Sequence, residues 1–254
     1  MAPHTVFIIP YRDRAEHKRR FEIYIAEVLR YNQWKEGIDV DIFFTHQCDK
    51  RSFNRGGMKN MGLKILKDKY PDYKNITMVF HDIDSIPNSP SLFPYKTTVG
   101  KVAHYYGFTF VLGGILAIKA GDFELVNGFP CFWGWGLEDN ALQTRCLSNG
   151  IEIDRSIFVP VLDKSVSRDG ELPIRTWSKD EGYTYKKGAK CGYDKMKHIK
   201  YTIDGRMMNV THFDPLSPYD ESSMVTTKPF RKMPVIHPLR NTFSNIIYGK
   251  RKNN

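Results

Sequence analysis

The sequence predicts an α/β fold in which a mostly parallel central sheet is flanked by helices. Three short apolar runs, at residues 5–9, 39–45 and 76–80, have the length and composition of buried strands. Between them lie residues 15–32 and 57–69, whose apolar side chains recur at helical spacing. This alternation places the strands in parallel with right-handed crossovers, and ligands then bind at the carboxyl ends of the strands.

A basic turn separates the first predicted strand from the first helix. Pro10 follows the apolar run and is expected to end the strand, because it has no backbone N–H to donate. The turn Tyr11-Arg12-Asp13-Arg14 comes next, so its arginines should lie at the ligand-binding edge of the sheet. One apolar stripe then marks the helix, formed by Phe21, Tyr24, Ile25, Val28 and Leu29.

The third predicted strand ends in two closely spaced acids, in the segment His81-Asp82-Ile83-Asp84. Two carboxylates at the end of a strand repel each other unless a cation neutralises them. Hard oxygen ligands suit Mg²⁺ or Mn²⁺, and such a metal commonly grips a nucleotide diphosphate. A solvated acidic turn is the plainer interpretation of this pair alone. The downstream motif described next favours the metal.

Residues 127–140 read Asn-Gly-Phe-Pro-Cys-Phe-Trp-Gly-Trp-Gly-Leu-Glu-Asp-Asn, which is unlike a core strand. Glycines beside Trp133 and Trp135 cost backbone entropy and fill no space. A mobile loop that lays flat aromatic faces on a sugar explains this alternation better. Glu138 and Asp139 should lie in the first turn of a helix over residues 138–148, where the helix dipole favours negative charge.

The remaining segments have weaker patterns. Residues 108–118 are expected to form a strand interrupted at Gly113-Gly114, where another group approaches the backbone closely. Residues 163–205 are polar and rich in lysine, aspartate and glycine, which predicts long loops and one short helix. Residues 206–213 should add one more strand. Because neither a repeat nor a linker divides the chain, residues 1–254 are expected to form a single domain.

Composition narrows the class of protein. The 254 residues are 41% hydrophobic and 26% charged, as in an ordinary soluble domain. The net charge of +10 is compatible with a nucleic-acid partner, but the lysines are scattered and no nucleic-acid motif is present, so we expect none. No apolar run is long enough for a membrane span. The four cysteines lack zinc-site spacing and are expected to be reduced thiols in a cytoplasmic protein.

Five elements occur in order along residues 5–150. They are Ile8-Ile9-Pro10-Tyr11-Arg12-Asp13-Arg14, Phe53-Asn54-Arg55-Gly56, His81-Asp82-Ile83-Asp84, Gly113-Gly114 and residues 127–139. Together they resemble the β-1,4-galactosyltransferase family, glycosyltransferase family 7, and the tryptophan–glycine–acid tract is the most specific of them. The resemblance implies a GT-A glycosyltransferase fold, with a Rossmann-like sheet flanked by helices. It also implies inverting transfer from a UDP-sugar donor with bound Mn²⁺, or Mg²⁺ in its place.

The resemblance assigns nucleotide and metal binding to the first half of the chain. Asp84 would be the main metal ligand. An arginine guanidinium suits phosphate because its planar fork donates two hydrogen bonds at once. The residues that would bind the nucleotide and its diphosphate are Pro10, Tyr11, Arg12, Arg14, Phe53, Arg55 and Asp82.

The same resemblance assigns the sugar and the chemistry to later residues. Gly114 and Trp135 would line the donor, Glu138 would contact the transferred sugar, and Asp139 would be the catalytic base. Galactose-specific members carry a tyrosine two residues before the glycine pair, whereas Val111 stands there in this sequence, or Leu112 if the alignment shifts by one. A smaller apolar residue at that position predicts tolerance of a 2-acetamido donor.

The sequence departs from the family in three places. Residues 161–169 contain no histidine, although the family has a metal-binding histidine in this region, so Asp163 and His212 are candidate ligands. Asn140 replaces a third acid, which leaves the acceptor open. The chain begins at the first strand without the family's membrane anchor and stem. We expect a soluble cytoplasmic form, or a Golgi lumenal one if an anchor has been removed.

We therefore predict an inverting, metal-dependent glycosyltransferase. It would move a hexose or N-acetylhexosamine, of galactose, N-acetylgalactosamine or N-acetylglucosamine type, from a UDP-sugar to a carbohydrate or glycoprotein hydroxyl. Residues 5–150 would form the nucleotide-sugar and metal part, and residues 151–254 the acceptor side. The alternative is a catalytically inactive carbohydrate- or nucleotide-sugar-binding protein on the same fold, which the missing histidine motivates. The retained acids Asp84, Glu138 and Asp139 argue against it.

Overall fold

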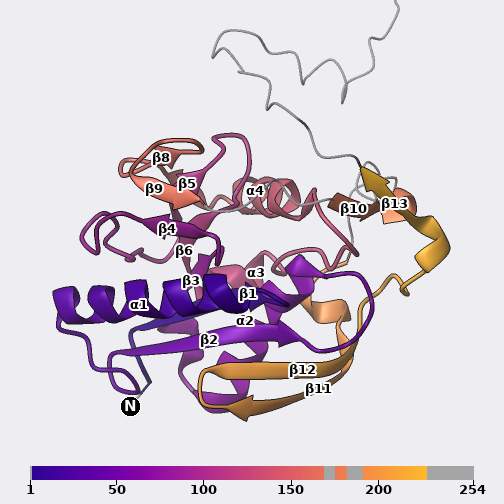
Figure 1. The fold of residues 1–254 in the computed structure, drawn as a ribbon, viewed down its shortest axis with the longest axis horizontal. Helices are drawn as coiled ribbons and strands as arrows, with labels where there is room; N and C mark the ends of the chain where they lie inside the picture. Colours follow the sequence, from indigo (N-terminus) through magenta and orange to yellow (C-terminus); the bar gives the residue numbers. More distant parts are fainter. Residues whose placement is uncertain (1, 169–174, 182–190, 228–254) are drawn as a thin grey trace, which may run out of the picture.

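A central mixed sheet organises the protein. The computed structural model describes residues 2–168, 175–181 and 191–227, and nine strands within them form this sheet (Figure 1). Two small ribbons lie outside it, β4 (Ser85–Pro87) with β9 (Val166–Arg168) and β10 (Arg175–Ser178) with β13 (Met224–Thr227). In sheet order the main strands are β11 (Lys197–Asp204), β12 (Met207–Asp214), β2 (Val40–Gln47), β1 (Thr5–Tyr11), β3 (Thr77–His81), β6 (Ile115–Lys119), β5 (Lys101–Gly107) and β7 (Glu152–Asp154), with β8 (Val159–Pro160) beside β5.

Four adjacent strands of the sheet are parallel, as predicted. β1 pairs in parallel with both β2 and β3, and β12 extends this set beyond β2. The predicted strands at 5–9, 39–45, 76–80 and 206–213 are thereby confirmed. β1 continues past Pro10 instead of ending there. Strands that are covered on both faces read as unbroken apolar runs, which is why the sequence reveals them.

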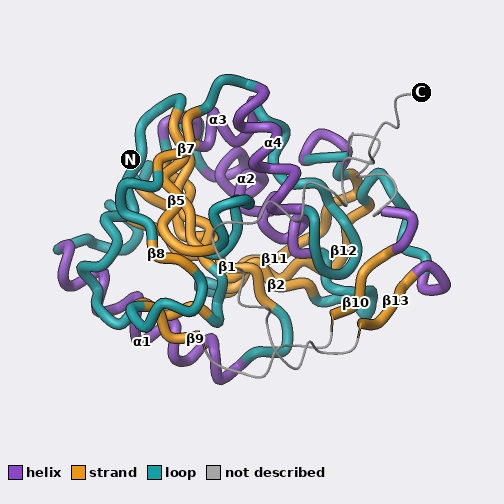
Figure 2. Tube along the Cα trace, turned by 90° about the horizontal axis from the view of Figure 1, so that it is seen from above, coloured by secondary structure: helices purple, strands orange, loops and turns teal. Residues whose placement is uncertain are grey.

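Helices cover both faces of this sheet (Figures 1 and 2). One face carries α1 (Ala15–Asn32), and the other carries α2 (Arg55–Lys69), α3 (Ala120–Leu125) and α4 (Glu138–Ser148). Alternate side chains of β1 enter the two cores, with Phe7 on the α1 side and Ile8 on the α2 side. The three longer helices confirm the three predicted ones. Within the described residues, no helix has the length and apolar character that crossing a membrane requires.

The helix α2 starts at a side-chain cap that also fixes the tryptophan–glycine tract. Asn54 Oδ1 accepts a hydrogen bond from the Gly57 backbone N–H at 2.8 Å, and Asn54 Nδ2 donates to the Cys131 carbonyl at 2.9 Å. A Cβ on Gly56 would overlap the carbonyl oxygen of Pro130. The first turn of α2 and the tract are therefore packed backbone against backbone.

The strand predicted over residues 108–118 is shorter in the structure than expected. Residues 108–114 form a turn, and β6 begins only at Ile115. The preceding strand β5 was not predicted, and it pairs antiparallel with β6 after the chain reverses at Gly107, whose φ is +149°. Buried polar aromatics such as His104 and Tyr106 fill β5, so its sequence lacks the aliphatic run that marks β1 to β3.

Over residues 163–205 the predicted short helix is confirmed, but the prediction of loops for the rest is wrong. Among its described residues this region contains β9, β10 and the whole of β11, besides the short helix η2 (Tyr193–Lys195). β11 is a lysine-bearing edge strand in which Ile199, Tyr201 and Ile203 alternate with polar residues, and Ile199 and Tyr201 pack against the core. This alternation is typical of a half-buried strand, but the polar composition of the region as a whole indicated loops. Residues 169–174 and 182–190 lie outside the described chain. Two further short helices are η1 (Tyr73–Asn75) and η3 (Glu221–Ser223).

Candidate active site

The turns that follow β1 and β3 meet at the carboxyl edge of the sheet, as expected. Arg14 Nη1 donates a hydrogen bond to Asp84 Oδ2 at 3.0 Å, and 31% and 15% of these side chains are exposed. The backbone N–H of Asp82 donates to the Gly114 carbonyl at 3.1 Å, which ties the end of β3 to the start of β6. The arginine and both acids of the predicted nucleotide site therefore lie together.

Arg55, in the first turn of α2, bridges two carboxylates. Its Nη1 donates to Asp82 Oδ1 at 3.2 Å, and its Nε lies 3.6 Å from Glu138 Oε1. Burial raises the pKa of Glu138 to about 7, and the charge of Asp139 adds to this rise. Burial also works against ionisation of Asp82, but the cations Arg55 and Lys59 outweigh it and lower the pKa of Asp82. Glu138 therefore changes charge near neutral pH, whereas Asp82 stays ionised.

Asp139 begins α4 between a buried lysine and a glycine. Its Oδ1 accepts a hydrogen bond from Lys59 Nζ at 3.0 Å, and a Cβ on Gly113 would overlap its Oδ2. Gly113 thus confirms the close approach expected at the glycine pair. One quarter of the Asp139 side chain is exposed, against 1% of Lys59. Burial raises the pKa of Asp139 although Lys59 opposes this, which brings the carboxylate nearer to the range of a general base at neutral pH.

Backbone hydrogen bonds hold the tract next to this carboxylate on both sides. Gly134 N–H donates to the Phe53 carbonyl at 3.1 Å, and Trp135 N–H donates to the Thr176 carbonyl at 2.7 Å. The Trp135 side chain is 43% exposed, so its indole face is accessible three residues before Glu138. An accessible aromatic face beside two carboxylates is the arrangement expected of a sugar site.

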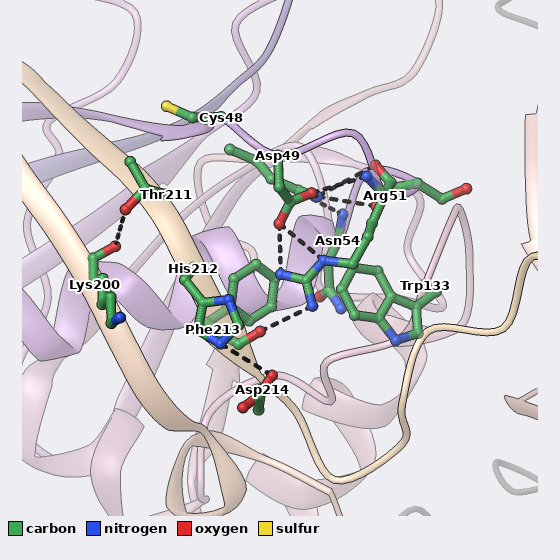
Figure 3. Close-up of polar contacts among 12 residues, drawn as sticks. Cys48, Asp49, Arg51, Asn54, Trp133, Lys200, Thr211, His212, Phe213 and Asp214 are labelled. Carbon is green, nitrogen blue, oxygen red and sulfur yellow. Dashed lines mark hydrogen bonds and ion pairs between the residues drawn. The ribbon is translucent and has the colours of Figure 1, made fainter.

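Trp133, by contrast, belongs to the scaffold. Its side chain is 2% exposed and stacks on Phe213, with ring centroids 5.6 Å apart. The guanidinium of Arg51 lies against both rings, 4.6 Å from the centre of the Trp133 ring and 4.8 Å from that of Phe213, and is paired with Asp49 (Figure 3). This cluster anchors the tract to β12. Trp133 therefore supports the loop, whereas the loop exposes Trp135 to solvent.

The predicted nucleotide residues surround one aromatic ring. Arg12 and Arg55 place their guanidinium groups 5.3 Å and 5.8 Å from the centre of the Phe53 ring. Pro10 and Tyr11 are the last two residues of β1 and enter the same edge. The arrangement joins an aromatic surface to a concentration of positive charge, which suits a base and its diphosphate.

The structure does not bring the other two candidate metal ligands to Asp84. The ribbon of β4 and β9 places Arg168 beside the Asp84 end, and Asp163 lies beyond the opposite end. His212 belongs to β12, which β2 and β1 separate from β3, and its Nε2 lies 3.3 Å from Asp214 (Figure 3). Within residues 2–168, 175–181 and 191–227, no three His, Cys, Asp or Glu side chains are grouped to hold a metal. Asp163 and His212 are therefore not carried into the proposal below.

Two basic residues of the site, Lys59 and Arg168, were not predicted from the sequence. Lys59 is buried in α2. The sequence did offer one signal for it, because the lysine stands between Met58 and Asn60 in the buried first half of this helix. Arg168 lies in the segment where the resemblance implies a histidine, and its charge helps to lower the pKa of Asp82. The acids of the site are thus surrounded by more positive charge than the motifs alone indicate.

A cavity of 680 Å³ lies elsewhere, at the opposite edge of the sheet. It is lined near the starts of β1 and β3 by Thr5 and Thr77, and none of the charged groups described above contributes to it. Ligands of parallel sheets bind at the carboxyl ends of the strands, and the ionisable side chains of this chain converge there. We therefore place the active site by its chemistry and not by this cavity.

Two family models match adjacent parts of the chain. Residues 2–93 match a model described as the N-terminal region of glycosyl transferase group 7. Residues 94–161 match a model described as the N-terminal domain of galactosyltransferase. The two matches are contiguous and cover more than half of the chain.

Curated relatives agree with these models. β-1,4-Galactosyltransferase 1 of Bos taurus is 31% identical over 165 residues, which are 61% of this chain and 39% of that protein. Drosophila melanogaster β-1,4-galactosyltransferase 7 is 31% identical over 58% of this chain and 46% of its own length, so both matches span less than half of the relative. A Caenorhabditis elegans protein named xylosylprotein 4-β-galactosyltransferase is 29% identical over 79% of this chain and 72% of its own length.

Solved structures share the fold. The catalytic domain of Drosophila β-1,4-galactosyltransferase 7 with xylobiose has a TM-score of 0.61 at 22% identity and covers 83% of this chain and 94% of its own. A mutant of that enzyme in complex with manganese, UDP-Gal and xylobiose has a TM-score of 0.59 at 21% identity. Fold, motifs and family models point the same way: the chain belongs to glycosyl transferase group 7, the β-1,4-galactosyltransferase family, and has its GT-A fold.

Proposed function

We propose that this chain transfers a hexose or N-acetylhexosamine from a UDP-sugar to a carbohydrate or glycoprotein hydroxyl, with inversion at the anomeric carbon. The observation that carries the proposal is the Asp139 carboxylate, which is partly exposed and fixed by Lys59 beside the charged edge of the sheet. Family membership supports the reaction class, because the relatives are named galactosyltransferases and a solved neighbour is in complex with UDP-Gal.

In the proposed reaction Asp139 accepts the proton of the acceptor hydroxyl as that oxygen attacks the anomeric carbon. The new carbon–oxygen bond forms on one face of the sugar while the bond to UDP breaks on the other, and its electron pair leaves with UDP. A single displacement without a covalent intermediate inverts the configuration. Arg12 and Arg14 offer guanidinium charge to the leaving diphosphate. Glu138, whose Oε2 accepts a hydrogen bond from the Gly136 N–H at 3.0 Å, would contact the transferred sugar.

Asp84 would hold a divalent cation together with the diphosphate. Its carboxylate is mostly buried at the end of β3, and oxygen ligands of this kind suit Mn²⁺ and Mg²⁺. Asp84 is the residue that would hold the cation, and the arginines of the turn after β1 would hold the diphosphate beside it. When bound, the cation supplies positive charge that stabilises the departing UDP.

Replacing Asp84 with alanine should weaken UDP binding about tenfold or more when Mn²⁺ is present, a change of about 1.4 kcal/mol. UDP binding without metal should not weaken, because the variant also frees Arg14 for the phosphates. Calorimetric titrations of UDP with and without Mn²⁺ measure both quantities. Asp163→Ala is the matched control and should bind like wild type, since it removes an exposed acid far from Asp84. Equal UDP affinities of wild type and Asp84→Ala in Mn²⁺ would remove Asp84 from the metal site.

The donor site should accept 2-acetamido sugars. Val111 is buried in the turn before β6, next to Leu112, whose N–H donates to the Asp139 carbonyl at 3.2 Å. Valine leaves room beside C2 of the sugar and offers no hydroxyl. We expect the enzyme to use UDP-N-acetylgalactosamine or UDP-N-acetylglucosamine as well as UDP-galactose. The values of kcat/KM for the 2-acetamido donors and for UDP-galactose should differ by no more than roughly 1–3 kcal/mol. Val111→Tyr should narrow the preference to UDP-galactose. Strong selectivity of the wild type for UDP-galactose over both would refute this assignment.

The acceptor is tested in the same assay. A relative that aligns with most of this chain is named for xylosylprotein, and the solved neighbours contain xylobiose, so a β-xyloside belongs among the acceptors beside N-acetylglucosamine. The alternative function is a carbohydrate- or nucleotide-sugar-binding protein without catalytic activity. It is motivated by the absence of a three-ligand metal group among the described residues. Saturable UDP-sugar binding with no UDP release for any acceptor would favour that alternative.

A further inference from the structure

Lys59 is a buried cation that contacts the proposed base but has no step of its own in the proposed reaction. It lies in the middle of α2 with 1% of its side chain exposed, and its Nζ is 4.5 Å from the centre of the Phe129 ring. Burying an ammonium group costs several kcal/mol unless a partner compensates, and an apolar side chain of similar size is usually at least as stable. Core packing therefore does not explain why a lysine occupies this position.

The partner of Lys59 is the proposed base itself. The ammonium lies 3.0 Å from Asp139 Oδ1, on the side of the carboxylate that faces the core. The other oxygen, Oδ2, lies over Gly113, where no side chain competes for space. One oxygen of Asp139 is thus occupied by a fixed donor, and the second rests against a glycine that carries no side chain.

The other charged groups near this pair come from three elements. Arg55 lies one turn earlier on α2, Asp82 follows β3, and Glu138 precedes Asp139 on α4. Burial alone would lower the pKa of Lys59, but these carboxylates outweigh it and raise the pKa above its ordinary value. Lys59 therefore keeps its charge across the pH range in which the enzyme would work.

His104 of β5 is the fourth ionisable group that faces Lys59, and it stays neutral. Its Nε2 lies 2.9 Å from the Gly113 carbonyl, and its Nδ1 accepts a hydrogen bond from Arg155 Nε at 3.0 Å. Burial lowers the pKa of His104 to about 4, and nearby cations contribute to the shift. Lys59 is therefore the cation that contacts Asp139, while His104 supports the Gly113 backbone against which the carboxylate rests.

We propose that Lys59 is a positioning residue for the transfer reaction: its ammonium keeps Asp139 ionised and fixes Oδ1, so that Oδ2 accepts the proton of the acceptor hydroxyl. This inference rests on the proposed function. Without Lys59, the more distant charge of Arg55 would remain as a weaker opposition to burial and the neighbouring acids, so the pKa of Asp139 would rise further. The base would then be protonated over more of the neutral range, and activity would require a higher pH.

The test is the pH profile of kcat/KM for UDP-sugar transfer in Lys59→Met, Lys59→Arg and wild type. Methionine keeps the volume and removes the charge, and should move the acidic limb of the profile upward by about 1–3 pH units. Arginine keeps the charge and should restore much of the wild-type profile. Lys64→Met, on the same helix but in an exposed pair with Asp68, is the matched control and should leave the profile unchanged. A uniform loss of activity at every pH in Lys59→Met would mean that Lys59 is only structural.

A second measurement separates this inference from the proposed function. The carboxyl carbon of Asp139 can be titrated by NMR in wild type and in Lys59→Met with ¹³C-labelled aspartate. A higher pKa of Asp139 in the variant supports the inference even if the wild type transfers no sugar, a result that would defeat only the proposed function. An unchanged pKa of Asp139 would overturn the role of Lys59 even in a fully active enzyme.

Discussion

Asp139→Asn should lower the turnover number for glycosyl transfer by about 10²- to 10⁴-fold, because it removes the group that accepts the acceptor proton. The asparagine amide has nearly the same shape as the carboxylate and is placed by the same backbone contact to Leu112. Donor affinity should therefore change little, so the loss falls on kcat. Steady-state kinetics at saturating UDP-sugar, together with calorimetric UDP binding, measure the two effects separately.

The matched control for this variant is Asp122→Asn. Asp122 also lies in the first turn of a helix, α3, and accepts a hydrogen bond from the Gly100 N–H at 2.7 Å, but it is remote from the charged edge of the sheet. It should keep wild-type turnover. Should Asp139→Asn retain wild-type turnover instead, another group is the base. Glu138, with a pKa of about 7, is then the first to be replaced.

Arg55→Leu should lower the free energy of unfolding by about 3 kcal/mol at pH 8, because it leaves two buried carboxylates without their shared cation. This value is the lower end of the loss of stability expected when one partner of a buried ion pair is removed. We choose the lower end because 22% of the Arg55 side chain is exposed to solvent. The same loss should abolish tight UDP binding, as Arg55 also flanks Phe53. Denaturant unfolding at a series of pH values measures the first effect.

The pH dependence of this loss follows from the direction of each pKa shift. Asp82 has a lowered pKa in the folded protein, so its stabilising contribution exists above the ordinary value of 3.8 and disappears as pH falls. Without Arg55 the largest part of that contribution is lost, although Lys59 and Arg168 remain, and the pKa of Glu138 rises above its present value of about 7. The penalty should be smallest below pH 4, grow as pH rises through the aspartate range, and grow again above pH 7. A penalty independent of pH would show that Arg55 stabilises the fold by packing alone.

The control for Arg55 is Arg19→Leu, which breaks an exposed ion pair with Glu16 on α1. The two side chains are 70% and 65% exposed, so this pair contributes little to stability at any pH. Arg19→Leu should therefore unfold at the same denaturant concentration as wild type across the whole series.

The first half of the fold could be predicted because its signals are local. Strands β1, β2 and β3 are buried on both faces, so each is an unbroken apolar run, and the intervening helices carry apolar residues at helical spacing. The acids at the start of α4 were also predictable, since helix dipoles favour them there. A close approach to the backbone at Gly113-Gly114 was also predicted, and the structure identifies the approaching group as the Asp139 carboxylate.

The elements and site residues that could not be predicted depend on contacts between segments far apart in the chain. β5 is buried but built from histidine and tyrosine, whose hydrogen bonds to distant backbone groups allow them to enter the core. The edge strand β11 alternates Ile199, Tyr201 and Ile203 with polar side chains, but the polar composition of the surrounding region hides this alternation. Lys59 is recognisable as part of the site only once α2 is seen packed beside α4. Likewise, Asp163 and His212 were candidates by residue type, and the pairing of β9 and β12 places them away from Asp84.

The most direct test of the central claim is the stereochemistry of one turnover. Purified protein is incubated with UDP-galactose or UDP-N-acetylgalactosamine, Mn²⁺ and a β-xyloside or N-acetylglucosamine acceptor, and the new linkage is examined by NMR. Because these donors carry the sugar in the α configuration, displacement assisted by Asp139 must yield a β-linked product and one UDP for each bond formed. An α-linked product, or no product and no UDP from any of these combinations, would contradict the account.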